Sequence, residues 1–349
     1  MLSPVRVRFA PSPTGFLHLG GLRTALFNYL LARKTGGKFV LRIEDTDQTR
    51  LVPGAVDNLV SALAWAGVRP DEGPSQGGDY GPYVQASSEA ADVLLKGEAY
   101  HCFCTPEQLA QQRLEASRTG RPTAYDRRCT RLAEREVAER LRQGVSSVIR
   151  FRVPAGRTQV EDVLHGSLSF DNATQEDPVL LKSDGMPTYH LASVVDDHAM
   201  RISHVLRGEE WLPSTPKHAM LYRSLGWQPP QFVHLPLLYN TDRTKLSKRF
   251  QHANVSYYQE SGYLPEAVVN FVALMGWSPK TTEEVFSMQQ LVDQFSLEGL
   301  NKAGAVVSHE KLDWLNKQHL MQKCSHEGDI APVVAQLRQA LRTSGLPST

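Results

Sequence analysis

The stretch RVRFAPSPTGFLHLGG, residues 6–21, constrains the fold more than any other part of the chain. Apolar and arginine side chains alternate from Val5 to Phe9, which predicts a strand, and the prolines and glycine that follow predict a tight turn. From Gly21 the apolar residues keep a helical spacing up to the Gly36–Gly37 pair, and a second strand, KFVLRIED, comes next. This order of strand, helix and strand predicts a parallel sheet with a right-handed crossover.

The turn that precedes this helix is suited to binding a phosphate. A helix N-terminus presents free N–H groups and the positive end of its dipole, and Gly20 and Gly21 allow a ligand to approach the backbone closely. His18 adds a hydrogen-bond donor for a phosphate oxygen. A short turn with glycine, taken alone, is more often only structural, because such motifs also match by chance.

A second polar motif, TKLSKRF at residues 244–250, follows a buried strand predicted over FVHLPLLYN. Lys245 and Lys248 flank Ser247 on what we expect to be a loop. Two lysines at this spacing can hold a leaving pyrophosphate, since positive charge stabilises the negative charge that develops there. A basic pentapeptide alone is usually a solvated loop, and its position after a buried strand is what favours the functional interpretation.

The length and composition of the chain limit the class of protein. A chain of 349 residues is long enough for two or three compact units. Lysine and arginine total 38 and aspartate and glutamate 37, a net charge of +1 that excludes a strongly basic nucleic-acid coat protein. No apolar run approaches the roughly 20 residues of a membrane span. The first strand begins too early for a signal or transit peptide, so we expect neither a membrane contact nor a targeting segment.

Changes in sequence character predict where the chain divides. The turn-rich stretch DEGPSQGGDYGP ends the first apolar unit, and the segment from about Tyr80 to Pro187 carries cysteines, arginines and short strands such as SVIRFRVP and SLSFD. TYHLASVVDDH then returns to an apolar, strand-to-helix character, so we expect a parallel sheet split by an insertion. TPKHAMLYRSLGW predicts a helix with Thr215 as N-cap and Pro216 at its first position. LPEAVVNFVALMGW and HEKLDWLNKQHL predict amphipathic helices in a mostly helical C-terminal part.

Six segments agree in kind and order with one known family. RFAPSPTG, HLGG, LRIEDTD, PTYHLASVVDDH, VLRGEEWL and KLSKR together resemble the glutamyl-tRNA synthetases, class I aminoacyl-tRNA synthetases with HIGH and KMSKS motifs, over residues from about 5 to 320. The resemblance implies ATP-dependent ligation of L-glutamate to the 3′ end of tRNA(Glu) through a glutamyl-adenylate, in protein synthesis, with Mg²⁺ on the ATP. The partners it implies are the acceptor end and stem of the tRNA, and we expect a monomer. Whether tRNA(Gln) is also charged stays open.

The resemblance also assigns segments of the chain to domains. It implies an α/β fold with a Rossmann-type catalytic domain in two halves, 1–79 and 188–250, split by an α+β acceptor-binding domain over 80–187. A helical stem-contact domain follows at 251–322, and 323–349 begin a truncated anticodon-binding region. Arginines of the inserted domain that suit sequence-independent phosphate contacts are Arg121, Arg127 and Arg128.

A pocket for glutamate needs cationic groups for two carboxylates and an anion for one ammonium group. Arg8 and Arg207 suit the carboxylates and Glu44 the ammonium, although such residues alone are as often a solvated ion pair. The resemblance places around the amino acid Arg8, Ala10, Ser12, Glu44, Tyr189, Ser193 and Arg207. It implies catalytic roles for His18, Lys245 and Lys248. The ATP contacts that it implies are His18, Gly20, Gly21, Glu210, Leu246, Ser247 and Lys248, whereas Glu209 is expected to face solvent.

Two positions depart from the family pattern. Gly21 stands where HIGH ends in a second histidine, a replacement that the family tolerates, so His18 is the imidazole that remains for ATP. Ser193 stands where many bacterial relatives have asparagine, which leaves a side-chain hydrogen bond to the substrate open at this position.

The cysteines show no extracellular disulfide framework, and three of the four lie close together. Three thiolates need a fourth partner to complete a tetrahedral zinc site. Relatives that hold zinc here have a histidine where this chain has Arg131, and Tyr125 is the other candidate, as in a related short family. Two interpretations therefore stay open for Cys102, Cys104, Tyr125 and Cys129: a zinc site, or a metal-free knuckle held by packing alone. Cys324 is expected to be a lone cysteine on a helix.

Other functions remain open at this point. A short glutamyl-queuosine tRNA(Asp) synthetase also lacks an anticodon-binding domain, but the helices predicted at the C-terminus favour the longer enzyme. The resemblance implies that glutamate-dependent pyrophosphate exchange needs tRNA in the longer family and not in the short one. A non-catalytic RNA-binding isoform has no chemical reason to keep the charged site residues, and a plain nucleotidyltransferase leaves Glu44, Tyr189 and Arg207 without a role. By similarity we expect the mitochondrial matrix, with the cytoplasm as the alternative.

Overall fold

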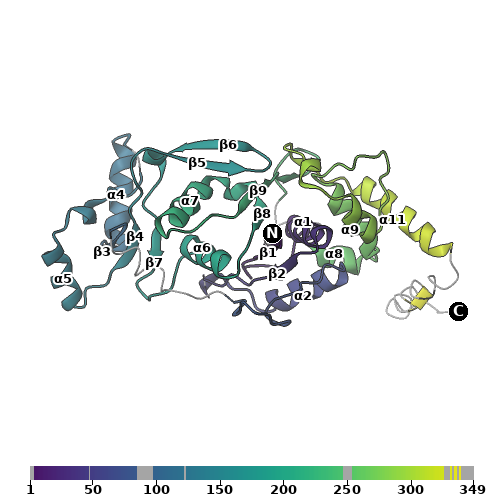
Figure 1. Ribbon diagram of the computed structural model, residues 1–349, viewed down its shortest axis with the longest axis horizontal. Coiled ribbons are helices and arrows are strands. Elements are labelled where there is room, and N and C mark those ends of the chain that lie inside the picture. The colour runs from purple at the N-terminus through teal and green to yellow at the C-terminus, as the bar shows by residue number, and fades with distance from the viewer. Residues whose placement is uncertain are drawn as a thin grey trace.

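The computed structural model is an elongated molecule in which three regions follow one another along the longest axis (Figure 1). Helices α4 (Pro106–Arg118) and α5 (Glu134–Arg142) lie at one end, the largest sheet lies in the middle, and α9 (Pro265–Leu274) and α11 (His309–Cys324) lie towards the other end. The structure describes residues 4–46, 48–84, 97–121, 123–246 and 254–325, together with residues 331, 334, 335 and 338.

Within the described residues, six strands form one mixed sheet in the order β2-β1-β8-β9-β5-β6. The first four strands run parallel to one another and β5 runs parallel to β9, whereas β6 is antiparallel to β5. This arrangement confirms the predicted α/β fold. The strands are β1 (Arg6–Phe9), β2 (Lys38–Leu41), β5 (Arg157–Asp162), β6 (Gly166–Asp171), β8 (His204–Gly208) and β9 (Gln231–Leu235).

The β5–β6 hairpin brings part of the predicted insertion into the large sheet. Alternate residues of β5 are buried, as is typical of a strand with one face on a core, and β5 contacts helix α7 (Thr215–Ser224). The remaining strands of the insertion form a separate antiparallel sheet in the order β3-β4-β7. The predicted limits 80–187 therefore enclose strands of two different sheets. The strands of the second sheet are β3 (Ala99–Cys102), β4 (Val148–Phe151) and β7 (Val179–Leu181).

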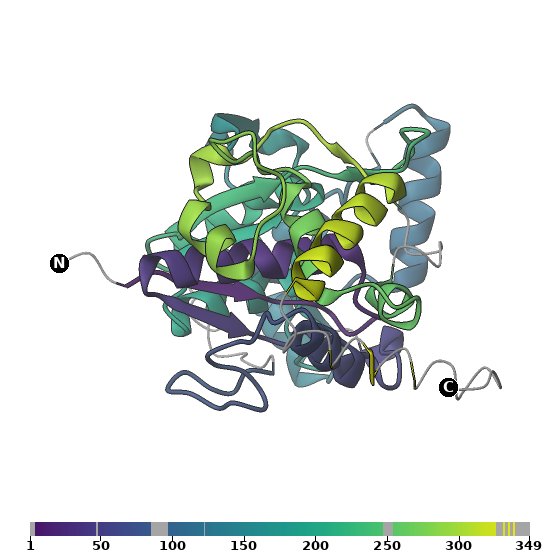
Figure 2. The same ribbon diagram turned by 90° about the vertical axis from the view of Figure 1, so that its right-hand side faces the viewer.

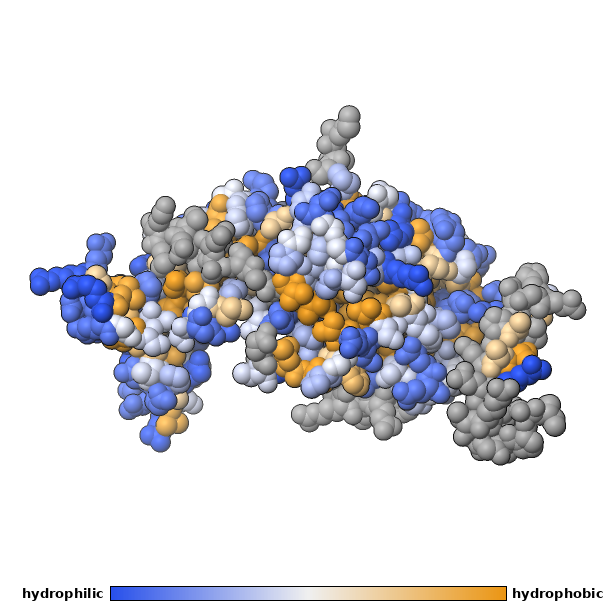
Figure 3. Space-filling view, turned by 90° about the horizontal axis from the view of Figure 1, so that it is seen from below, coloured by the Kyte–Doolittle hydropathy of each residue, from blue (hydrophilic) through white to orange (hydrophobic). Residues whose placement is uncertain are grey.

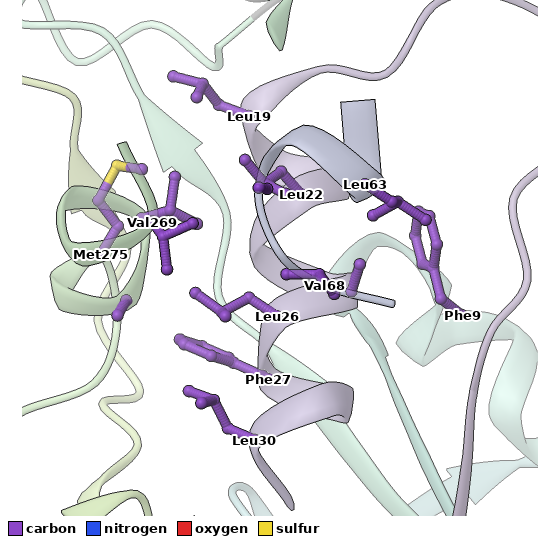
Figure 4. Close-up of a cluster of buried hydrophobic side chains, with 14 of the residues drawn as sticks. Phe9, Leu19, Leu22, Leu26, Phe27, Leu30, Leu63, Val68, Val269 and Met275 are labelled. Carbon is purple, nitrogen blue, oxygen red and sulfur yellow. The ribbon is translucent and has the colours of Figure 1, made fainter. Parts of the chain in front are cut away.

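Helix α1 (Leu19–Thr35) is at the centre of the main core. It contacts β1, β2 and β8 on the sheet and also α9 and α10 (Met288–Gln294) of the C-terminal part. Figure 4 shows Leu26 and Phe27 of α1 pointing towards Val269 and Met275, with Leu63 on the other side of the helix. A helix that is packed on several sides needs apolar residues around most of its circumference, and eight of the ten buried residues of α1 are apolar, the exceptions being Arg23 and Asn28.

Helix α7 differs from its prediction in one respect. It begins at Thr215 and has Ser214 as its N-cap, so the predicted N-cap role of Thr215 is wrong. The hydroxyl group of Thr215 instead accepts from Nη2 of Arg207 and lies within hydrogen-bond distance of Nε2 of His234 and of the carbonyl oxygen of Trp211. The chain is helical from Tyr189, and the strand before this helix, β7, ends at Leu181. The other α-helices with bounds within the described residues are α2 (Ala55–Trp65), α6 (Tyr189–Ala199) and α8 (Val255–Glu260).

The surface mixes polar and apolar side chains. Seen from the end that carries α11, the C-terminal helices lie in front of the large sheet (Figure 2). On the face seen from below, apolar side chains gather towards the middle, among polar ones (Figure 3). None of the helices in the described segments combines the length and the apolar character that crossing a membrane requires.

Candidate active site

A cavity of about 430 Å³ opens at the carboxyl ends of the parallel strands. Strands β1 and β8 are neighbours in this sheet. The strand that follows β1 in the sequence, β2, lies on one side of the pair, and the strand that follows β8, β9, lies on the other side. Ligands of open α/β sheets bind at the carboxyl ends of the strands where the order reverses in this way. The cavity is lined by the turn after β1, the start of α1, the end of β8 and the loop around β10 (Leu238–Tyr239).

Most of the predicted site residues meet at this cavity. Ser193 does not line it, because it lies on a buried part of α6, where its Oγ has no hydrogen-bond partner among the described residues. Ser247 and Lys248 lie outside the described residues. The predicted residues that line the cavity are Arg8, Ala10, Ser12, His18, Gly20, Gly21, Glu44, Tyr189, Arg207, Glu210, Lys245 and Leu246.

One edge of the Arg8 guanidinium group is paired with the carboxylate of Asp197. Its Nε and Nη2 donate to the two carboxylate oxygens of Asp197 at 3.0 and 3.2 Å, and both side chains are buried. Burial is the largest single influence and acts to lower the pKa of Arg8, but the charge and hydrogen bonds of Asp197 together with the charge of Glu44 outweigh it and raise this pKa. Nη1 donates to none of the residues that the structure describes. This nitrogen therefore remains for an anion in the cavity.

Only one of the two carboxylate oxygens of Glu44 accepts a hydrogen bond from a described side chain. Oε1 accepts from Nη2 of Arg42 at 3.0 Å, whereas Oε2 accepts from none of the described side chains. Burial raises the pKa of Glu44, and the positive charges of Arg42 and Arg8 only partly offset this. A cationic ligand group near Oε2 would stabilise the ionised carboxylate.

Arg207 is a buried cation that forms no ion pair with any carboxylate in the described part of the chain. Burial lowers its pKa. Because a buried charge without a counter-ion is costly, this guanidinium group favours an anionic ligand. All of its hydrogen-bond partners are formally neutral groups, namely His234 Nε2 at 3.0 Å, Thr215 Oγ1 at 3.0 Å, Tyr189 Oη at 3.2 Å, His218 Nδ1 at 3.3 Å and the Trp211 carbonyl oxygen at 3.5 Å.

His18 is the N-cap of α1. Its Nδ1 accepts from the backbone N–H of Gly21 at 3.1 Å, so the neutral ring carries its proton on Nε2 and can donate from there. The first N–H groups of a helix have no partner within the helix. The imidazole and the start of α1 therefore lie together at the cavity, in an arrangement that suits an anion, and their role in binding phosphate stays a prediction.

Glu209 and Glu210, which follow β8 directly, lie in different surroundings. Oε1 of Glu209 accepts from the backbone N–H of Leu237 at 3.0 Å, and the residue is half-buried, so it is only partly open to solvent. Glu210 is more exposed and lines the cavity. Its carboxylate lies close to Gly208, where a Cβ atom would be 2.2 Å from Oε2 unless the Glu210 side chain moved.

Lys245 is held beside the cavity by a hairpin. The backbone N–H of Leu246 donates to the Leu238 carbonyl at 2.8 Å, and Arg243 takes the left-handed conformation in the turn between them. Lys245 and Leu246 thereby line the same cavity as His18. For the described part of the TKLSKRF motif, the two polar motifs meet as the sequence predicts.

Sequence reasoning missed the buried charges that hold this site together. Nη1 of Arg42 donates to Asp197 at 2.8 Å, so the chain Arg8–Asp197–Arg42–Glu44 is one continuous network. Both missed residues stand in segments that attracted attention for other reasons, LRIEDTD and VVDDH. The sequence did contain a signal for them: Arg42 stands in a predicted strand and Asp197 on an otherwise apolar helix. Charged residues in such buried elements are almost always paired with an opposite charge.

The predicted zinc candidates form one cluster. The Sγ atoms of Cys102, Cys104 and Cys129 lie within 4.8 Å of one another. The Tyr125 hydroxyl oxygen is 3.4 Å from the sulfur of Cys102 and 3.9 Å from that of Cys104. Ligands about 2.3 Å from a tetrahedral zinc ion are about 3.8 Å apart, so the four groups fit such an ion. The guanidinium carbon of Arg150 lies 4.2 Å from the ring centroid of Tyr125. Burial and the neighbouring thiols of Cys102 and Cys129 nevertheless raise the pKa of the Tyr125 hydroxyl, so its ionisation as a ligand would depend on the metal.

The three arginines predicted to contact phosphates all have carboxylate partners. Arg127 pairs with Asp177 at 2.8 Å and Arg128 with Asp126 at 2.8 Å. Arg121 pairs with Glu115 at 3.4 Å. A phosphate at these residues would have to replace or share an existing ion pair, and their role stays a prediction.

Comparison with known proteins shows which family this chain resembles over most of its length. Residues 4–314 match the model of a family described as tRNA synthetases class I (E and Q), catalytic domain. A protein named Glutamate--tRNA ligase from Dehalococcoides mccartyi is 52% identical over 327 residues, an alignment that covers 92% of this chain and 66% of that protein. A protein of the same name from Chloroherpeton thalassium is 50% identical over 363 residues, covering 99% of this chain and 72% of that protein. The chain thus spans about two thirds of the length of these relatives.

Solved structures are similar over nearly the whole chain. A glutamate-tRNA synthetase from Elizabethkingia anophelis superposes with a TM-score of 0.91 at 42% identity, covering 99% of this chain and 75% of that one. A glutamate tRNA ligase from Elizabethkingia meningosepticum, solved in complex with its amino acid, gives a TM-score of 0.90 at 42% identity, with 99% and 74% covered.

Proposed function

This chain belongs to the class I tRNA synthetases for glutamate and glutamine, and on that premise we propose that it joins L-glutamate to the 3′ end of tRNA(Glu) in protein synthesis. The reaction uses ATP and passes through a glutamyl-adenylate. Charging of tRNA(Gln) as a second substrate is the finer alternative within the same proposal.

One observation carries the choice of glutamate. Arg8, Arg207 and Glu44 line the same cavity, and they offer two cationic groups and one anionic oxygen. Glutamate matches this set with two carboxylates and one ammonium group. Glutamine would leave one guanidinium group without an anion, and a site whose buried polar groups stay unpaired rejects such a substrate strongly.

The chemistry follows from positioning and charge. The α-carboxylate of glutamate attacks the α-phosphorus of ATP, and the bond from that phosphorus to the bridging oxygen breaks as pyrophosphate leaves. The terminal ribose hydroxyl of the tRNA then attacks the acyl carbon and AMP leaves. Held by the protein, the reactants avoid much of the entropic cost of meeting.

We assign the phosphate contacts to the two polar motifs. His18 and the start of α1 bind the triphosphate, and Lys245 with Lys248 stabilises the leaving pyrophosphate, where negative charge develops. Mg²⁺ arrives with the nucleotide and shares this task. Gly20 and Gly21 allow the nucleotide to approach the backbone, and Glu210 and Leu246 complete its surroundings.

The tRNA contacts are assigned to the regions on either side of the large sheet. The segment 80–187 would bind the acceptor end and the segment 251–322 the stem, with phosphate contacts that weaken as salt concentration rises. The monomeric state belongs to the same proposal.

Zinc, where it binds, is held by Cys102, Cys104, Cys129 and Tyr125, whose separations suit a tetrahedral ion. The cluster lies at the second sheet, away from the residues that line the cavity, so the ion would supply structural stability and no step of the reaction.

The function is tested by glutamate-dependent exchange of pyrophosphate into ATP, measured with and without tRNA(Glu). We expect exchange with glutamate, none with glutamine, and a requirement for tRNA. Exchange without tRNA would favour the glutamyl-queuosine alternative, and no exchange under either condition would favour a non-catalytic isoform.

The compartment is proposed by similarity alone. The segments FLHLGGLRTAL and YGPYVQ favour a mitochondrial member, with the cytoplasm as the alternative. The relatives named above are bacterial. Fractionation of cells that express the full-length protein would distinguish the two compartments.

A further inference from the structure

A buried polar chain links the inserted hairpin to the candidate amino-acid pocket. Oδ2 of Asp162 lies 2.7 Å from Nδ1 of His234, and Nε2 of His234 accepts from Nε of Arg207 at 3.0 Å. These residues come from β5, β9 and β8, and Arg207 and His234 are register partners in the parallel pair. All three are at most 5% exposed, and only Arg207 lines the cavity.

Hydrogen-bond donors around the chain define the protonation state of His234. Asp162 accepts from the backbone N–H groups of Leu164, His165 and His234, so its carboxylate is ionised and takes the Nδ1 proton of the imidazole as a further hydrogen bond. An arginine can only donate, so Nε2 must carry a lone pair. His234 is therefore neutral, with its proton on Nδ1, and burial lowers its pKa in the same sense.

The contacts of Arg207 divide into short and long ones. His234 and Thr215 hold Nε and Nη2 at 3.0 Å. The contacts of the two Nη atoms to Tyr189, His218 and the Trp211 carbonyl are longer, at 3.2 to 3.5 Å. A substrate carboxylate can replace the long contacts while the short ones keep the guanidinium plane in place.

We propose that His234, oriented by Asp162, is a positioning residue that fixes the guanidinium group of Arg207 for a substrate carboxylate. The inference rests on the proposed function, because it takes Arg207 as a carboxylate contact. An aspartate bound directly to Arg207 would neutralise its charge and compete with the substrate carboxylate. Asp197 occupies one edge of the Arg8 guanidinium group in this way. A neutral imidazole between Asp162 and Arg207 transmits the orientation and leaves the positive charge unpaired.

Two substitutions of His234 separate positioning from packing. In His234→Gln, an amide oxygen can take the place of Nε2 and still accept from Arg207. In His234→Asn, the shorter amide reaches the place of Nδ1 and leaves Arg207 without this acceptor. We expect His234→Asn to raise the KM for glutamate about ten- to hundredfold, because a hydrogen bond to a charged group is lost, and His234→Gln to stay within about threefold of the native protein. The KM for ATP should change in neither.

The result that overturns the inference is a glutamate KM that is the same in both variants, whether native or equally raised. Thermal unfolding of both variants shows whether a change in KM merely follows a loss of stability. If His234→Asn fails to fold, long-range ¹H–¹⁵N spectra of the native protein decide: a proton on Nδ1 and a lone pair on Nε2 at neutral pH are expected, and the opposite tautomer or a charged ring would reject the inference. If the native protein shows no glutamate-dependent exchange, the proposed function fails instead, and the spectra still test the geometry.

Discussion

Asp197 accepts from Nε and Nη2 of Arg8 with both of its carboxylate oxygens, at 3.0 and 3.2 Å, inside the protein. Arg42 donates to the same carboxylate at 2.8 Å. Asp197 does not line the cavity, yet it sets the orientation of one residue that does. Several of the predictions below depend on buried charges of this kind.

Asp197→Asn should lower the free energy of unfolding by about 3–5 kcal/mol, because it leaves two buried arginines without their shared counter-charge. Urea unfolding at neutral pH measures this. Asp126→Asn is the matched control, since Asp126 pairs with Arg128 at the surface and should cost less than about 1 kcal/mol. Equal effects of the two substitutions would mean that the buried network contributes no more than a surface pair.

Glu44→Gln should weaken glutamate binding while it stabilises the protein at neutral pH. Burial raises the pKa of Glu44 above 4.5, so the folded protein binds this proton more tightly than the unfolded chain does. The ionised carboxylate therefore opposes folding above the folded-state pKa, and this cost disappears as pH falls below about 4.5. Urea unfolding of both proteins should show a gap at pH 7 that closes at acid pH. A Glu44→Gln protein that is less stable at pH 7 would contradict the assignment.

Arg207→Gln should raise the KM for glutamate at least about tenfold in pyrophosphate exchange, because a charge-assisted hydrogen bond to the carboxylate is lost. The KM for ATP should stay unchanged. Arg223→Gln, an exposed position on α7, serves as the control. An unchanged glutamate KM would remove Arg207 from the pocket.

Lys245→Ala should slow pyrophosphate exchange by roughly 100-fold at saturating substrates, because a positive charge on the leaving group is lost. Lys248→Ala should slow it by a similar or larger factor, with glutamate affinity almost unchanged in both variants. Lys317→Ala, an exposed lysine on α11, controls for loss of charge alone. A native exchange rate in both variants of the motif would reject its role in holding pyrophosphate.

Metal analysis of the purified protein tests the cysteine cluster. If the cluster holds zinc, we expect about one ion per chain, lost in Cys129→Ser and retained in Cys324→Ser, because Cys324 lies at the exposed end of α11. Removal of zinc by a chelator should lower the unfolding temperature and leave the KM for glutamate unchanged. A native protein without zinc would support a knuckle held by packing.

The turn and the helix start at the site were predictable because a short continuous segment of sequence determines them. HLGG shows both the end of a turn and the start of a helix, and His18 with Gly21 makes the cap that closes it. The partners of the site residues were not predictable. Arg8 and Asp197 are 189 positions apart and Asp162 and His234 are 72 apart, and no local periodicity encodes such pairs.

Local rules also failed where tertiary contacts competed with them. The hydroxyl of Thr215 fits a helix N-cap by residue type, but a buried arginine and histidine claim it instead. Ser193 was assigned by its place in a motif, and the helix turns it into the protein interior. A sequence also does not show which sheet a strand joins, so the pairing of β5 with β9 was not predictable.

The hairpin of residues 157–171 affects how the chain can be divided by engineering. Because β5 is hydrogen-bonded to β9, a shortened enzyme that omits the whole insertion would expose a bare sheet edge beside the pocket. Grafting an insertion from a relative would face the same difficulty, since the donor hairpin would have to match both the edge and the residue at position 162. Cut points placed outside 157–171 keep the pocket side of the sheet intact.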